Sequence, residues 1–384
     1  MVSSSAGSRP RALLLGAGHA HLYTLRRAAA FSRRGFELTL VAPENFWYSG
    51  LATGVLGGHY PPSLDQIDVD LLAHRGGGRF VRDRVMEIDV VGRTVRLESG
   101  DQLAFDVLSL NLGSEVPLDE IAGAEAHGYS IKPIKNLWQL RQDLLRRLES
   151  AQPAAPLRLV VIGGGATGCE IAANAENLVR NARGAANITL LVAGERLLEQ
   201  FPWGAARRLE RALRERGIEI RYRTRVESVA AGKVSTTGDG TVAFDLLVYA
   251  TGLRPHPLLR STGLPVDRDG ALIVDSHLRS IADPRIHGGG DCITLQDRAL
   301  PKIGVFAIRE GPVLFHNIFA ALERRPPRSF EPQKRWLLIL NLGDGTGLAA
   351  WDRFWWFGRL AFRLKDQIDR RFLSEYNSSA TRVI

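Results

Sequence analysis

Two stretches of the chain share one pattern: a short apolar run, a glycine-rich turn and then a segment with helical spacing. Apolar residues fill 13–15 and 159–162 without alternation, as in strands that are buried on both faces. Helical spacing follows at 22–31 in the first unit and from 171 onward in the second. The pattern predicts two strand–turn–helix units in an α/β protein.

The turn of the second unit carries the full G-x-G-x-x-G spacing, with Gly163, Gly165 and Gly168. In this motif the first glycine makes a tight turn, the second lets the backbone approach a pyrophosphate, and the third lets helix and strand pack closely. The free N–H groups at the start of the helix favour phosphate. A turn that only connects a strand to a helix is the competing interpretation, and a second copy of the motif favours nucleotide binding.

The turn of the first unit is a degenerate copy. Gly16 and Gly18 are present, but His21 stands where the third glycine is expected. The next strand, at 36–41, ends without the acid that binds a ribose in such folds, and Glu44 follows shortly after it. Phosphate binding is therefore expected to survive here, and Glu44 is the candidate for the ribose contact.

The same acid is missing from the second unit. Val192 occupies its position at the end of the strand predicted at 188–192, and Arg196 lies nearby. An arginine in place of the acid permits a 2′-phosphate, so NADH and NADPH both remain open. Arg196 facing water is the alternative.

Further periodicity predicts helices at 137–148, 205–216 and 305–322, and short strands within 80–111 and 219–242. The region after 336 is aromatic and basic, and from residue 351 its spacing predicts a helix. The apolar seam of this helix would consist of Phe354, Phe357, Ala361, Leu364, Ile368 and Phe372. Such a helix lies on a membrane interface or packs on its own protein, and both alternatives stay open.

Composition restricts the classes of function. The 384 residues allow two or three domains, and the net charge is +9, from 50 basic and 41 acidic side chains. The basic residues are scattered and no nucleic-acid motif appears, so we expect no nucleic-acid partner. Cys169 and Cys292 are the two cysteines, without a metal-type spacing. We expect no metal, two packing cysteines, and a reducing, cytoplasmic location.

Four motifs occur in a fixed order: Gly16-Ala17-Gly18, Gly163 to Gly168, Ala250-Thr251-Gly252 and Gly290-Asp291. Through them, residues 11–322 resemble the two-dinucleotide-binding-domain flavoproteins, the pyridine nucleotide–disulfide oxidoreductase superfamily. The resemblance implies FAD on the first glycine motif and NAD(P)H on the second, as co-substrate. The cofactor-binding residues expected on these motifs are Gly16, Gly18, His19, Ala20, Glu44, Gly163, Gly165, Gly168, Thr251, Gly252, Gly290, Asp291 and Ala307.

The resemblance also implies roles for groups near the flavin. Asp291 would accept hydrogen bonds from the ribityl chain, and the helix near Val305 would point its N-terminus at the flavin pyrimidine. Lys302 directly precedes this helix and is the first candidate for tuning the flavin, because a cation there stabilises the negative charge of its reduced form. Glu170, next to Cys169 at the start of a helix, is the second candidate. Their alternatives are a solvated loop lysine and a helix-start acid.

No cysteine occurs at 47–55, where the disulfide reductases of this superfamily carry their redox pair. The remaining likeness is to the type II NADH dehydrogenases, and closer still to flavoproteins found alone or fused ahead of selenophosphate synthetase. Residues 16–21, 47–50, 57–60, 304–311 and 364–372 carry that likeness. Type II enzymes have glutamines near the quinone in an Ala-Gln-x-x-x-Gln-Gln arrangement, and 304–310 lacks them. Quinone is therefore one candidate among electron acceptors.

The resulting hypothesis is an FAD-dependent oxidoreductase with two Rossmann-like domains and a small C-terminal segment. The FAD domain would comprise 1–120 and 256–330, the NAD(P)H domain 121–255, and the C-terminal segment 331–384. Hydride would pass from NAD(P)H to flavin, and electrons on to an acceptor, without a redox disulfide. The alternatives are a flavin-binding sensor or partner-binding protein, and a redox partner in selenium metabolism. Peripheral contact with the inner face of a membrane, through the C-terminal segment, stays open.

Overall fold

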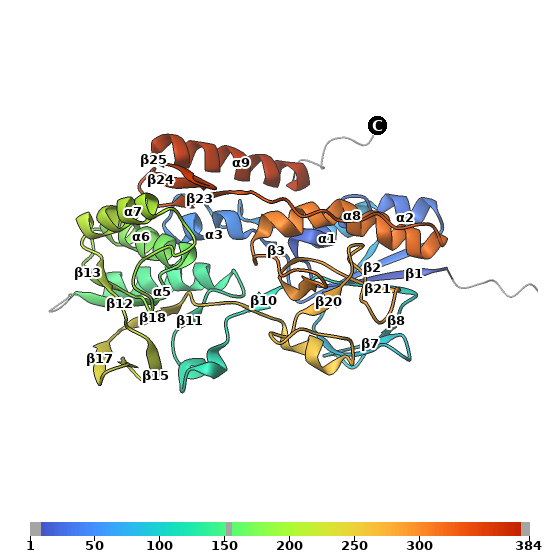
Figure 1. Cartoon of the computed structure of the whole chain (residues 1–384), viewed down its shortest axis with the longest axis horizontal. Helices are drawn as coiled ribbons and strands as arrows, with labels where there is room; N and C mark the ends of the chain where they lie inside the picture. The colour runs from blue at the N-terminus through green and yellow to red at the C-terminus, as the bar shows by residue number, and fades with distance from the viewer. Residues whose placement is uncertain (1–8, 151–155, 378–384) are drawn as a thin grey trace, which may run out of the picture.

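The computed structural model describes residues 9–150 and 156–377. Its body contains two parallel sheets, each covered by helices (Figure 1). The fold is α/β with two Rossmann-like units, as the sequence predicts.

The first sheet has five parallel strands in the order β21-β9-β1-β2-β5. Its strands are β1 (Arg11–Leu15), β2 (Glu37–Ala42), β5 (Arg79–Arg82), β9 (Val107–Leu110) and β21 (Ile286–Gly288). β1 lies at the centre and is buried from residue 12 to residue 15, which explains its continuous apolar run. Along the chain, β21 comes after all the strands of the second sheet, so this unit is built from two separate parts of the chain.

Helices α1 (His19–Leu25), α2 (Ala29–Arg33), α4 (Val69–Arg75) and α8 (Gly304–Glu323) surround this sheet. The single helix expected at 22–31 is instead the pair α1 and α2. The N–H groups of Arg27 and Ala28 donate to the carbonyls of Thr24 and Leu25, three residues back, which tightens the chain and ends α1.

The second sheet also has five parallel strands, in the order β11-β18-β12-β13-β14. Its strands are β11 (Tyr129–Ser130), β12 (Leu157–Ile162), β13 (Ala186–Leu191), β14 (Glu219–Arg221) and β18 (Leu246–Tyr249). The predicted helices are confirmed as α5 (Asn136–Ser150) and α7 (Trp203–Glu215), beside the long α6 (Ala166–Asn181) that follows the second glycine turn.

Smaller strands and helices pack on the two units and connect them. One meander is β6 (Val85–Asp89), β7 (Thr94–Leu97) and β8 (Gln102–Ala104), and another is β15 (Val226–Ala230), β16 (Lys233–Thr236) and β17 (Gly240–Ala243). The shorter elements are β3 (Phe46–Trp47), α3 (Ser49–Leu56), β4 (Gln66–Ile67), β10 (Ser114–Glu115), η1 (Leu118–Glu120), η2 (Ala124–Ala126), β19 (Arg254–Pro255), η3 (Pro257–Ser261), β20 (Leu272–Val274), η4 (Gly290–Cys292) and β22 (Ile293–Leu295). Between the units, β10 pairs with β19, and Arg254 forms an ion pair with Glu115 at 2.8 Å.

The C-terminal segment lies along one side of the molecule, over α3, α6 and α7 (Figure 1, red). It consists of β23 (Leu337–Asn341), β24 (Gly347–Trp351), β25 (Phe354–Gly358) and α9 (Arg359–Asn377). The helix predicted from residue 351 is therefore wrong in its first part. Asp352 turns the chain with φ 56°, and the aromatic residues of β25 pair with β24, as aromatic side chains favour.

The predicted seam of α9 is only partly right. Ala361 is buried and Phe372 packs partly buried on the core, as predicted. The buried residues of this helix are Ala361, Phe362, Asp369, Leu373 and Tyr376, whereas Ile368 is 45% exposed. Lys365 and Asp369 face inward, because they bond to Gly50 and Tyr48 at the start of α3. The buried face of α9 is therefore rotated away from the face that apolar spacing alone predicts. The helix packs on its own protein, which is one of the two alternatives left open by the sequence.

Among the described helices, α8 is long and apolar enough to cross a membrane by length and composition. The core helix of a globular domain passes the same test. α8 packs against α1 and buries two polar side chains, Glu310 and Asn317, beside Leu314 and Ile318. Its apolar character is accounted for by these contacts.

Candidate functional site

The first glycine turn is tied to the end of β9 by one side chain, Asn111. Gly16 has φ +87°, and an added Cβ there would lie 2.4 Å from the Asn111 carbonyl oxygen. At Gly18 an added Cβ would lie 2.2 Å from Asn111 Oδ1. This Oδ1 accepts the N–H of Ala20 at 3.1 Å, and Asn111 Nδ2 donates to the Gly289 carbonyl at 2.6 Å. Only glycine fits at either position of this turn.

His21 replaces the third glycine with a buried, hydrogen-bonded ring. One ring nitrogen lies 2.7 Å from the Gly16 carbonyl oxygen and the other 2.8 Å from Ser109 Oγ. Burial lowers the pKa of His21 to about 4, so the ring is neutral at pH 7. The degenerate motif is thus closed by a histidine that fastens the turn to β9, and its phosphate-facing glycines are retained.

The Gly-Asp motif and the start of α8 lie against this turn. The N–H of Gly290 donates to Glu310 Oε2 at 2.5 Å, and Asp291 Oδ2 accepts from Ser114 Oγ at 2.6 Å. Lys302 Nζ donates to the Asp291 carbonyl at 3.0 Å, so it is not a solvated loop lysine. Of the predicted residues, Ala307 also belongs here, since an added Cβ at Gly290 would contact its Cβ at 3.5 Å.

His19 lies where the first turn, the start of α8 and α9 meet. The centroid of its ring is 4.8 Å from that of Phe46, 5.7 Å from that of Tyr48 and 6.0 Å from that of Phe372. An added Cβ at Gly304 would lie 3.4 Å from His19 Nε2. Burial lowers the pKa of His19 to about 4, which keeps it neutral.

Glu44, the candidate for the ribose contact, lies two residues beyond the end of β2 at Ala42. Its Oε2 accepts from Lys135 Nζ at 2.8 Å, and the two side chains are 28% and 41% exposed. Both can therefore rearrange around a ligand. Lys135 is a neighbour of this position that spacing along the sequence does not reveal.

The second turn, between β12 and α6, has two glycines in crowded positions and one beside open space. Gly163 has φ +125° and would place a Cβ 2.1 Å from the Ala250 carbonyl, while a Cβ at Gly168 would lie 1.9 Å from the Gly163 carbonyl. At Gly165 an added Cβ meets nothing within 4 Å. No side chain caps the start of α6, so its first N–H groups face that open space. The Ala250-Thr251-Gly252 motif, after β18, borders the same turn.

The surroundings of the 2′-position differ from both alternatives drawn from the sequence. Val192 is buried and packs beside Gly164, where an added Cβ would lie 2.6 Å from its Cγ1. Arg196 donates to the carbonyls of Leu198 and Phe201 at 3.2 Å, and to that of Glu199. The guanidinium therefore does not point freely into water. In this position it holds the loop after β13 and is not free to bind a 2′-phosphate.

Glu170 links the second turn to the C-terminal segment. Its Oε1 accepts the N–H of Asn341, at the end of β23, at 2.6 Å, and it also bonds to Thr53 of α3. Burial raises the pKa of Glu170 to about 7, against the opposing effect of the Lys365 ammonium. An acid that titrates near neutral pH is suited to proton exchange.

Cys169 and Cys292 are buried and not bonded to each other. Burial raises the pKa of both thiols, that of Cys292 to about 12, so neither is a reactive thiolate at pH 7. In residues 9–150 and 156–377 there is no group of three or more His, Cys, Asp and Glu side chains able to hold a metal ion.

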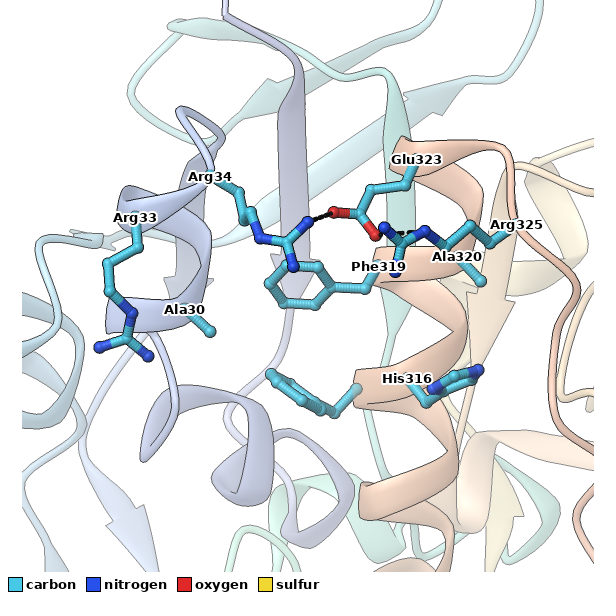
Figure 2. A pocket seen from close by; sticks show the side chains of 9 residues that line it. Ala30, Arg33, Arg34, His316, Phe319, Ala320, Glu323 and Arg325 are labelled. Carbon is cyan, nitrogen blue, oxygen red and sulfur yellow. Dashed lines mark hydrogen bonds and ion pairs between the residues drawn. The ribbon is translucent and has the colours of Figure 1, made fainter.

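A surface hollow of about 360 Å³ lies between α2 and α8, away from both glycine turns (Figure 2). Phe315 and Phe319 contribute its apolar lining. Glu323 lies between Arg34 and Arg325 and forms ion pairs with both, as Figure 2 shows. Glu323 thus offsets part of the charge of the arginines that line this hollow, and we assign no chemistry to it.

Comparison with known proteins agrees with this arrangement. A family model described as pyridine nucleotide-disulphide oxidoreductase matches residues 10–316, which include both glycine turns and the Gly-Asp motif. The chain belongs to this family. Membership confirms the predicted oxidoreductase class and the predicted cofactors, FAD and NAD(P)H.

Two relatives and one solved structure extend the likeness over most of the chain. The demethylphylloquinone reductase NdbB of Synechocystis sp. is 27% identical over 366 residues, 89% of this chain and 87% of the relative. The alternative NAD(P)H-ubiquinone oxidoreductase C1 of Arabidopsis thaliana is 26% identical over 392 residues, 90% of this chain and 72% of the relative. The structure of NDH2 from Plasmodium falciparum in complex with NADH has a TM-score of 0.82 at 16% identity, covering 95% of this chain and 96% of that one.

Proposed function

We propose that this protein passes a hydride from NAD(P)H to FAD and then reduces a quinone. The observation that carries the proposal is the pair of glycine cradles, at Gly16–Gly18 and at Gly163–Gly168, in which an added Cβ has no room or would fill the space left for phosphate. Bound FAD would supply the two-electron chemistry, and the chain supplies position, charge and exclusion of water.

The FAD site would be assembled from 1–120 and 256–330. Its pyrophosphate would lie on the first turn, beside His19 and Ala20, and its ribose near Glu44. Asp291 and the start of α8, with Ala307, would hold the ribityl chain and flavin, and Lys302 would supply a nearby cation. NAD(P)H would lie on the second turn within 121–255, with Thr251, Gly252 and Glu170 at its edge.

Quinone is favoured as the acceptor because the names of both relatives describe enzymes that act on quinones. One feature differs from the type II NADH dehydrogenase pattern. Glu310 occupies a position where that pattern has glutamine, and its carboxyl group bonds to the Gly290 N–H. A quinone would therefore be bound by groups other than a glutamine at this position.

Peripheral membrane contact is part of the proposal, but through β24 and β25 and not through the seam of α9. We define the aromatic hairpin surface as the exposed apolar residues Trp203, Trp351, Phe354, Trp355, Trp356 and Leu360. Arg207 stacks on Trp203 at 4.5 Å, and Arg208 stacks on the nearby Phe357 at 3.8 Å. Tryptophan beside arginine suits the interface of an anionic membrane, where the enzyme would meet an apolar quinone.

Steady-state turnover tests the proposal. Purified protein with bound FAD should oxidise NADH or NADPH rapidly with a short-chain quinone and slowly with oxygen alone. Bound flavin with slow turnover on every quinone would instead favour the sensor or partner-binding alternative. The link to selenium metabolism stays a prediction.

A further inference from the structure

A buried cluster of ionisable groups joins α9 to the segment around α3. Tyr48 OH donates to Asp369 Oδ1 at 2.8 Å, and Lys365 Nζ donates to Asp369 Oδ2 and to the Gly50 carbonyl, both at 2.6 Å. The side chains of Lys365 and Asp369 are only 12% and 7% exposed. With Asp65, these residues form what we call the α9 cluster: Tyr48, Asp65, Lys365 and Asp369.

Asp65 is the unusual member of the α9 cluster. It is 1% exposed, and neither of its carboxyl oxygens has a hydrogen-bond partner among the described residues. Its main chain is fixed, because its carbonyl accepts the N–H of Tyr48 at 2.8 Å. An ionised carboxylate without donors costs several kcal/mol when buried, so this group is held in its neutral form.

The charges around Asp65 act in the same direction as burial. Burial and the Asp369 carboxylate raise the pKa of Asp65 to about 9, and the Lys365 ammonium only partly opposes them. Tyr48 also faces this acid, and its own pKa is raised by burial and by Asp369 and Asp65. At pH 7 the cluster thus holds an Asp369–Lys365 ion pair beside a carboxyl group that keeps its proton.

The proposed reaction consumes one proton in each turnover. NAD(P)H, one proton and a quinone give NAD(P)⁺ and a quinol, because the hydride carries two electrons with a single proton. The cluster lies within electrostatic reach of Glu170. Lys365 and Asp369 act on the pKa of Glu170 in opposite directions, so the charges of the cluster reach the start of α6.

We propose that Asp65 stores this proton and releases it toward the Asp369–Lys365 pair when the acceptor is reduced. Because neither Asp65 oxygen has a hydrogen-bond partner here, the release requires a turn of the Asp65 side chain or a bridging water. The O–H bond of the Asp65 carboxyl group breaks, the proton ends on the quinol, and the resulting carboxylate is neutralised again by a proton from solvent. Asp65 acts through its neighbours and does not touch the reacting atoms. The proposal rests on quinone reduction as the function.

The solvent side of this path has a structural counterpart. Tyr60 OH donates to Asp366 Oδ1 at 2.9 Å, and the Asp366 side chain is 29% exposed. Asp366 lies one helical turn before Asp369 on α9, and Asp369 in turn raises the pKa of Tyr60. His59, whose pKa is lowered by burial, packs beside Tyr60 with ring centroids 5.0 Å apart. These polar groups place a partly exposed carboxylate within one helical turn of the cluster.

Infrared spectroscopy tests whether Asp65 holds a proton, without depending on turnover. At pH 8, where Glu170 and Glu310 are mostly ionised, the carbonyl stretch of a protonated carboxyl group should be present, should be lost in Asp65→Asn, and should persist in Asp68→Asn. Asp68 is a matched control, because it is exposed and its role as cap of α4, accepting from Leu71 N–H, can be taken over by asparagine. A band that survives unchanged in Asp65→Asn would overturn the proposal.

Separate half-reactions then test whether the proton is used. In Asp65→Asn, flavin reduction by NAD(P)H should stay within about twofold of wild type, while reoxidation by quinone at pH 8 should slow by roughly tenfold or more, since tenfold corresponds to about 1.4 kcal/mol in the barrier. The defect should shrink toward pH 5, where solvent supplies protons. Equal slowing of both half-reactions, or of neither, would contradict proton storage.

Tyr48→Phe is the second variant, because it keeps the ring stacked on Phe372, with centroids 4.7 Å apart, and removes only the donor to Asp369. Because the Asp369 carboxylate then accepts one hydrogen bond fewer, its interaction with the Asp65 carboxyl group should change. The infrared band of Asp65 should therefore shift without being lost. An unchanged band would show that the cluster is not coupled. If wild-type flavin is not reoxidised by quinone at all, the proposed function fails, whereas the infrared result still stands on its own.

Discussion

The three glycines of the second turn differ in what surrounds them, although the motif treats them alike. Gly168 has the Gly163 carbonyl 1.9 Å from an added Cβ, and Gly165 has open space. Gly168→Ala should therefore destabilise the fold by about 1–3 kcal/mol through overpacking. Gly165→Ala should leave stability within about 0.5 kcal/mol and raise the KM for NAD(P)H, because its methyl group occupies the phosphate position.

Chemical denaturation and steady-state kinetics on both variants check this contrast. Equal loss of stability in the two would mean that the space at Gly165 is structural and does not face a ligand.

Lys302 is held against the Gly-Asp motif by its bond to the Asp291 carbonyl. Lys302→Ala should keep FAD bound and slow reduction of the flavin by NAD(P)H by roughly tenfold, about 1.4 kcal/mol, because the negative charge of the reduced flavin loses a nearby cation. Lys302→Arg keeps the charge and should recover most of the rate. Stopped-flow absorbance measures both variants, and a wild-type reduction rate in Lys302→Ala would remove this residue from the mechanism.

The glycine motifs could be read from the sequence because the geometry of a turn is local. Asn111, Glu310 and Asp65 could not, because their roles depend on partners from distant parts of the chain, such as Gly289 for Asn111. Asn111 did leave a weak signal, a polar residue directly after the buried run of β9. Asp65 left none, since an aspartate in a loop usually faces water.

At the scale of elements, the C-terminal segment shows the limit of periodicity. The apolar spacing over 354–372 fits a helix, yet β25 takes the first part because its aromatic residues pair with β24. α9 then turns polar groups inward, where Lys365 and Asp369 bond to the segment around α3. Helices α5, α7 and α8 agree with the prediction, whereas the helix expected at 22–31 is divided into α1 and α2.

The aromatic hairpin surface gives a prediction for membrane binding. Phe354 is 75% exposed and Leu360 is 72% exposed, so replacing both with serine should weaken binding to anionic vesicles by tenfold or more, because full burial of such a side chain contributes about 1.5–3 kcal/mol. Val91→Ser is the control, since Val91 is 92% exposed in the turn after β6. Vesicle co-sedimentation measures the effect, and equal binding by all variants would locate the membrane contact elsewhere.

For the whole molecule, buried ionisable groups predict how stability depends on pH. Burial raises the pKa of Asp65 to about 9 and those of Glu170 and Glu310 to about 7, so each keeps a proton that the unfolded chain has lost, and stability falls as pH rises toward these values. Burial lowers the pKa values of His19, His21 and His287 to about 4, which makes stability rise with pH up to about 6.5.

Below pH 6.5 the acids and the histidines change the free energy of unfolding in opposite directions. Above pH 7 only the acids still make it depend on pH. The free energy of unfolding should therefore be nearly flat from about pH 5 to 6.5 and fall between pH 7 and 9, by up to about 1.4 kcal/mol per pH unit. Asp65→Asn should remove most of that fall. Denaturation at a series of pH values tests this, and a wild-type stability that rises from pH 7 to 9 would contradict the assignment of Asp65 as a neutral acid.

The central claim, hydride transfer from NAD(P)H to FAD and onward to a quinone, is tested most directly by an anaerobic titration of the purified protein. Flavin absorbance should bleach on addition of one equivalent of NADH or NADPH, and recover when a short-chain quinone is added. The nucleotide that bleaches faster would also identify the preferred donor. Bound flavin that neither nucleotide reduces, or reduced flavin that no quinone reoxidises, would contradict the account.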